Sequence, residues 1–161
     1  KSQLTYNNWH KPLIKFFDNV EKNLNVKIII AAHPKSLKKN TINIYRPRKV
    51  YFNNTNKLIK NSKFAITLRS TALNYSAIYN KPIMFISSNA LTKTTNRFIK
   101  FIANKFGQNP ININEPFNKN FLNNFLKFDY RSLNKYKVDY ISTLLKEKPN
   151  YKIIIENLNM I

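Results

Sequence analysis

Glycine occurs once in this chain of 161 residues, cysteine does not occur at all, and only seven residues are acidic. The absence of cysteine excludes disulfides and cysteine-bound zinc sites. A single glycine excludes the P-loop and the G-x-G-x-x-G fingerprint, because each needs more than one. No apolar run approaches the roughly 20 residues of a membrane-spanning helix. These absences agree with a cytoplasmic protein, either free or peripheral on the inner face of the cell membrane.

Basic side chains dominate the charged residues, with 28 Lys and Arg against 7 Asp and Glu, for a formal net charge of +21. Such an excess is typical of proteins that bind nucleic acid or an anionic membrane. Lysine, asparagine and isoleucine are all abundant (23, 27 and 20 residues), which is also typical of AT-rich genomes. The lysines are spread along the chain. We therefore favour a basic surface that faces acidic lipid or a nucleotide phosphate. A nucleic-acid-binding domain is the alternative from another class.

Apolar runs alternate with amphipathic segments along the chain. Strands are expected at 26–32, 49–52, 63–68, 82–87 and 110–114, and helices at 10–24, 54–62, 70–80, 91–107, 131–148 and 151–161. A helix-like connection is expected between the first two strands. This alternation predicts an α/β fold, a Rossmann-like parallel sheet with helices on both faces. No linker divides the chain, so residues 1–161 are expected to form one domain.

Two of the expected strands end in polar motifs. His33 and Pro34 follow the first strand, and Arg69, Ser70 and Thr71 follow the third, at the start of a helix. Ligands of parallel sheets bind beyond the carboxyl ends of the strands. Hydroxyls and backbone N–H groups at a helix start attract anions, and a histidine can donate to a phosphate or pair with it. The sequence thus predicts a phosphate pocket without a glycine-rich loop.

Each motif also has a purely structural interpretation. Pro34 restricts the residue before it to an extended conformation, so His33 could simply shape a turn. Ser70 and Thr71 could simply cap a helix. Because both motifs, 37 residues apart, fall on the same expected edge of the sheet, we favour the phosphate pocket.

The stretch from Val26 to Ser87 resembles the donor-binding half of GT-B glycosyltransferases that use cytidine nucleotides. The bacterial CMP-sialic acid sialyltransferases and polysialyltransferases have a His-Pro motif after one strand and a Ser-Ser or Ser-Thr motif at a later helix start. The segment "NTNKLIKNSKFAITLRSTALNYSAIYNKPIMFIS" also resembles capsule and teichoic-acid enzymes that use CDP-glycerol. In both groups a strand leads to the hydroxyl pair, followed by a helix.

The resemblance implies a function in surface-polysaccharide synthesis. It assigns donor-phosphate binding to His33, Ser70 and Thr71, and places Pro34 beside the cytosine. The donor would be a CMP-sugar of the sialic acid or Kdo type, or alternatively a CDP-linked glycerol. The acceptor would be a glycan or a lipid-linked molecule, and no metal or other cofactor would be required. The sequence departs from the family at Ala31 and Asn56, where some members have a lysine and a ribose-binding glutamate.

The catalytic base of these enzymes is an acidic residue of the other, amino-terminal half. The seven acids here are scattered, and none follows the first or the third expected strand. We therefore expect the chain to be the carboxyl-terminal half of a longer enzyme and to be inactive alone. A missing amino-terminal domain would supply the base and the acceptor site.

Overall fold

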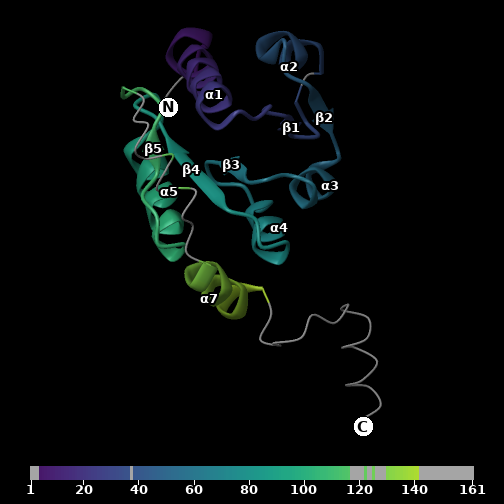
Figure 1. Ribbon diagram of the computed structural model, residues 1–161. Coiled ribbons are helices and arrows are strands. Elements are labelled where there is room, and N and C mark those ends of the chain that lie inside the picture. Colours follow the sequence, from purple (N-terminus) through teal and green to yellow (C-terminus); the bar gives the residue numbers. More distant parts are fainter. Residues whose placement is uncertain (1–3, 37, 117–121, 123–124, 126–129, 142–161) are drawn as a thin grey trace.

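Short strands and helices alternate in the computed structural model, which describes residues 4–36, 38–116, 122, 125 and 130–141 (Figure 1). The strands are β1 (Ile30–Ala32), β2 (Val50–Phe52), β3 (Ala65–Thr67), β4 (Ile83–Ser87) and β5 (Ile111–Asn112). The helices are the π-helix η1 (Tyr6–His10) and α1 (Lys11–Leu24), α2 (Lys38–Tyr45), α3 (Thr55–Lys60), α4 (Leu73–Ile78), α5 (Lys93–Lys105) and α7 (Tyr130–Tyr140). The helix expected at 151–161 and the end of that expected at 131–148 lie outside the described residues.

All strand pairs are parallel, and helices flank them, so the chain has a mixed α/β fold compatible with a Rossmann-like arrangement. The strands form two small sheets: β1 pairs with β2, and β4 lies between β3 and β5. The sequence predicted one sheet, and the described residues show no ladder between β1 and β3. Figure 1 shows β1 and β2 beside α1 and α2, with β3, β4 and β5 in the other part of the molecule.

The first apolar run differs most from its expected structure. A central buried strand was predicted for 26–32, but the strand begins only at Ile30. The side chain of Ile29 is 48% exposed, and Ala31 is also exposed. The prediction failed because one side of β1 has no strand partner, which leaves part of the run facing a cavity.

Strand β4 lies at the centre of the core and is covered on both faces. Met84 and Ile86 pack with α1 residues such as Phe16 and Val20. The alternate residues Ile83 and Phe85 pack with α4, α5 and α7 in a second buried cluster. Successive side chains of a strand point to opposite faces. The four-residue apolar run "IMFI" therefore reflects burial on both sides, as predicted for a strand between two layers of helices.

A buried cation joins α1 to the start of β2. Arg48 is 8% exposed, and its Nη2 donates to Asp18 Oδ1 at 2.5 Å and to Glu21 Oε2 at 2.6 Å. Glu21 Oε1 also accepts from the N–H of Ile28, which leads into β1, at 2.8 Å. Burial alone would lower the pKa of Arg48, but the hydrogen bonds and charges of the two carboxylates outweigh it and raise the pKa. The guanidinium therefore stays charged and fixes α1 against the first sheet.

The left-handed backbone positions are taken mainly by asparagine. Gly107 follows α5 at φ +66°, as predicted for its role in ending the helix. Asn25, Asn53 and Asn80 also have positive φ, at 48°, 59° and 52°. The N–H of Gln108 donates back to the α5 carbonyl of Ala103 at 3.0 Å, a bond typical of this helix end.

Substituting Arg48 by alanine should destabilise the fold by about 1–3 kcal/mol. The variant leaves Glu21, whose side chain is only 26% exposed, without its cation. Urea denaturation of Arg48→Ala would measure the change, with the exposed Arg46→Ala as the matched loss of one charge. Equal stability of the two variants would contradict the bridging role of Arg48.

Substituting Gly107 by alanine should cost about 1–2 kcal/mol, because an L-residue is strained at positive φ. The added Cβ would also lie 2.9 Å from Ser132 Oγ on α7. Thermal unfolding of Gly107→Ala and of the double variant Gly107→Ala/Ser132→Ala separates the two causes. The double variant should regain only the part of the lost stability that comes from contact between the added Cβ and the Ser132 hydroxyl. A Gly107→Ala chain as stable as the parent would overturn the assignment.

Candidate functional site

A cavity of about 1210 Å³ lies between the two sheets, where β1 and β3 are not paired with each other. It is lined by β1 and the residues leading to it, by α3, by β3 and by the loop that follows β3. Helix α3 closes one side, because it contacts β1 and also α4. The unpaired edges of two parallel sheets thus open onto one space.

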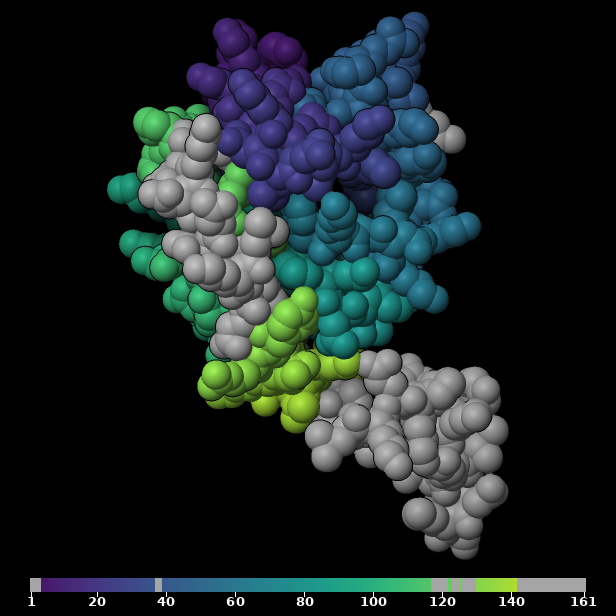
Figure 2. Space-filling view, viewed as in Figure 1, coloured from purple at the N-terminus to yellow at the C-terminus, as the bar shows by residue number. Residues whose placement is uncertain are grey.

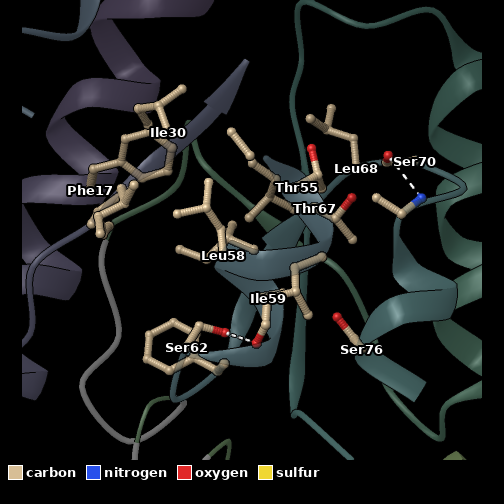
Figure 3. Close-up of a pocket in the computed structure, with 18 of the residues that line it drawn as sticks. Phe17, Ile30, Thr55, Leu58, Ile59, Ser62, Thr67, Leu68, Ser70 and Ser76 are labelled. Carbon is tan, nitrogen blue, oxygen red and sulfur yellow. Dashed lines mark hydrogen bonds between the residues drawn. The ribbon is translucent and has the colours of Figure 1, made fainter. Parts of the chain in front are cut away.

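The cavity wall has an apolar part and a hydroxyl-bearing part (Figure 3). Phe17, Ile30 and Leu58 contribute rings and methyl groups from α1, β1 and α3. The hydroxyl-bearing part includes Thr55 of α3, Thr67 of β3, Ser70 of the following loop and Ser76 of α4. Such a wall suits a ligand with one flat apolar part and several hydrogen-bonding groups.

Arg69 and Ser70 lie at this cavity, directly after β3, and both are exposed. Ser70 Oγ accepts from the N–H of Ala72 at 3.2 Å, and the Ser70 carbonyl accepts from the N–H of Leu73 at 3.0 Å. Residues 70–72 therefore form a turn, and α4 begins at Leu73 rather than at Ser70 as predicted. The local hydrogen bonds of Ser70 explain the later start. Thr71 is exposed and does not line the cavity.

His33 and Pro34 follow β1, as the sequence predicted, and both are exposed. His33 Nδ1 accepts from the N–H of Lys35 at 3.1 Å, and the His33 carbonyl accepts from the N–H of Ser36 at 2.9 Å. Neither His33 nor Pro34 is among the residues that line the cavity. Of the five predicted site residues, the cavity brings together Arg69 and Ser70, and the phosphate-binding role of His33 stays a prediction.

Ser76 is a site residue that sequence reasoning missed. Its side chain is fully buried on α4, and its hydroxyl has no hydrogen-bond partner within the described part of the chain. An unsatisfied buried hydroxyl costs about 1–3 kcal/mol, so a ligand atom that pairs with it would gain affinity. In the sequence, Ser76 could be recognised only as a serine on the same face of a helix as Leu73 and Ala77. That pattern is also typical of small residues that pack in the core.

The carboxyl ends of β4 and β5 are occupied by a network of asparagines. Asn114 Oδ1 accepts from Ser88 Oγ at 2.7 Å and from the N–H of Asn89 at 2.9 Å. Asn112 Nδ2 donates to Asn89 Oδ1 at 2.8 Å and to Glu115 Oε1 at 3.1 Å. These mutual hydrogen bonds hold the two loops together. Within the second sheet, the carboxyl end that this network leaves open is that of β3.

Carboxylates do not line the cavity among the described residues. Asp18 and Glu21 bind Arg48, Glu115 accepts from Asn112, and Asp139 lies exposed on α7. In the same part of the chain, no group of three or more His, Cys, Asp or Glu side chains could hold a metal ion. The groups that face a ligand here are hydroxyls and a guanidinium, which can bind and neutralise an anion but cannot accept a proton near neutral pH.

A scan against protein-family models, a search of curated proteins and a search of solved structures each found no match to this chain.

Proposed function

We propose that this chain is the donor-nucleotide-binding domain of a glycosyltransferase that uses a CMP-sugar. The observation behind the proposal is the cavity between two parallel sheets, with Arg69 and Ser70 at the carboxyl end of β3. This is the end of a parallel strand at which α/β proteins bind nucleotides. The motif resemblance around Ser70 and Thr71 supports the choice of a cytidine nucleotide.

The chemistry of the wall suggests an orientation for the nucleotide. The base would pack on the apolar part formed by Phe17, Ile30 and Leu58. The polar atoms of the base and ribose would face the partly exposed hydroxyls of Thr55 and Thr67. The phosphate would lie at the outer end, where Arg69 is exposed and can form two parallel hydrogen bonds with phosphate oxygens.

In this orientation the domain would stabilise the leaving phosphate during sugar transfer. In a displacement at the anomeric carbon, the oxygen of the acceptor hydroxyl bonds to that carbon while the carbon's bond to the CMP phosphate oxygen breaks, and negative charge develops on that phosphate. A guanidinium and hydroxyls stabilise this charge without a metal ion. The base that takes the proton of the acceptor hydroxyl must lie within hydrogen-bond reach of it. That base would come from a further domain, which would also bind the glycan or lipid-linked acceptor.

Two other functions would use the same features. A CDP-glycerol transferase would use the cavity with a second phosphate at Arg69. A nucleic-acid-binding domain is favoured by the formal charge of +21. Salt separates this last class from the others, because binding of a long polyanion weakens steeply as salt rises, whereas binding of one nucleotide in a cavity changes much less.

Titration calorimetry should show CMP binding more tightly than UMP or AMP. Arg69→Ala should weaken CMP binding by about 1.5–3 kcal/mol, the value of a hydrogen bond to a charged group. The matched control is Arg46→Ala, which removes an exposed arginine that does not line the cavity and should leave binding unchanged. His33→Ala in the same series tests whether the histidine does more than shape its turn.

Several outcomes would contradict the proposal. Equal, weak binding of the three nucleotides would reject the cytidine assignment. An equal loss in the Arg69 and Arg46 variants would show that net charge, rather than the site, attracts the nucleotide. Transfer of sugar from CMP-sialic acid or CMP-Kdo by the 161-residue chain alone would show that the base lies within it.

A further inference from the structure

Helix α5 exposes two large aromatic side chains on its outer face. Phe98 is 47% exposed and Phe101 is 59% exposed. Residues three apart are neighbours on a helix surface, so the two phenylalanines leave the same part of α5. The opposite face of the helix carries the buried Ile99 and Ala103, and α5 packs against β4. The phenylalanines are therefore additional to what the core requires.

A lysine connects these rings to a neighbouring helix. Lys105 Nζ lies 5.2 Å from the centre of the Phe101 ring and 5.9 Å from that of Tyr140 on α7. Tyr140 is itself 56% exposed. The three exposed rings and the cations among them form one surface across two helices. We call it the α5–α7 surface, and its residues are Arg97, Phe98, Lys100, Phe101, Lys105 and Tyr140.

The charge of this surface has one sign along α5. The helix contains Lys93, Arg97, Lys100 and Lys105 and no acidic residue. The carboxylates of Asp18 and Glu21 pair with Arg48, and neither Arg97 nor Lys100 is paired with a carboxylate of the described residues. The acid on the described part of α7 is Asp139. The surface thus combines exposed rings with cations in excess.

We propose that the α5–α7 surface binds the face of an anionic lipid bilayer. Exposed aromatic rings insert among the headgroups at a membrane interface, and the lysines around them meet the negative charges there. Each Lys or Arg near such a surface is attracted by the negative headgroups. In the described part of the chain no helix is long and apolar enough to cross a bilayer, so contact through these helices would be peripheral.

The geometry favours lipid over the other polyanions and over self-association. RNA bases need open ring faces on which to stack. The ring of Tyr140 already stacks on Tyr136, with centres 4.9 Å apart, and Lys105 lies over the rings of Phe101 and Tyr140. Two copies meeting here would bring two cationic surfaces together, which like-charge repulsion opposes. An anionic bilayer takes both the rings and the charges.

The test is vesicle co-sedimentation of the full chain with phosphatidylcholine vesicles that contain or lack phosphatidylglycerol. The parent chain should sediment with the anionic vesicles only. Phe98→Ser/Phe101→Ser keeps the net charge and should weaken binding at least about tenfold, because it removes both inserting rings. Lys100→Gln/Lys105→Gln should weaken binding on the order of tenfold. The matched control Lys11→Gln/Lys15→Gln removes the same charge from exposed positions of α1 that do not line the cavity, and should have little effect.

Other results would overturn the proposal. Equal losses from the two lysine pairs would show attraction by net charge alone, and unchanged binding by the serine variant would show that the rings do not insert. No residue of the α5–α7 surface lines the nucleotide cavity. Vesicle binding and nucleotide binding can therefore fail independently of each other. A labelled single-stranded RNA that binds the parent chain, and not the serine variant, would assign the surface to RNA. A shift of the parent chain to a dimer that the serine variant lacks would assign it to a second copy.

Discussion

The guanidinium of Arg48 lies between α1 and the first sheet, and the positions of that sheet and of one cavity wall depend on its ion pairs. The sheet of β1 and β2 has only three residue pairs, too few to be stable alone in water. Asp18 and Glu21 anchor it to α1, and α1 contributes Phe17 to the cavity wall. In the space-filling view, α1, α2 and β2 lie together at one end of the molecule (Figure 2). The buried charge and the packing of Ile30 and Tyr45 on the core cluster of α1 together position the apolar side of the cavity.

The sequence predicted which segments are strands better than how they pair. The run "IMFI" in β4 is apolar at every position, which requires burial on both faces, and the structure has both faces covered. The only glycine marks the end of α5, where an αL residue is needed. The absence of pairing between β1 and β3, by contrast, was not predicted. An apolar run such as 26–32 shows that its side chains favour burial, but it does not show whether a strand or a cavity lies beside it.

The sequence could predict only those site residues whose place in the fold follows from the order of strands and loops along the chain. Arg69 and Ser70 come directly after a strand, and parallel strands bring the loops at their carboxyl ends to one edge of the sheet, so the sequence was enough to put them near a cleft. Ser76 could not be found in this way, because its role depends on what surrounds it in space. A serine beside Ala77 fits tight helix packing equally well. His33 shows the opposite case, in which the predicted strand end is present but the side chain hydrogen-bonds within its own turn.

The asparagines at left-handed positions also affect the chain before it folds. Asn25, Asn53 and Asn80 occupy conformations that glycine reaches more easily. Glycine, however, has the greatest conformational freedom to lose when a chain becomes ordered. A chain that uses asparagine at three such turns samples fewer backbone states when unfolded, so less entropy opposes its folding. The steric cost in the native turns is therefore partly offset by a stiffer denatured ensemble, a benefit that no contact in the folded protein reveals.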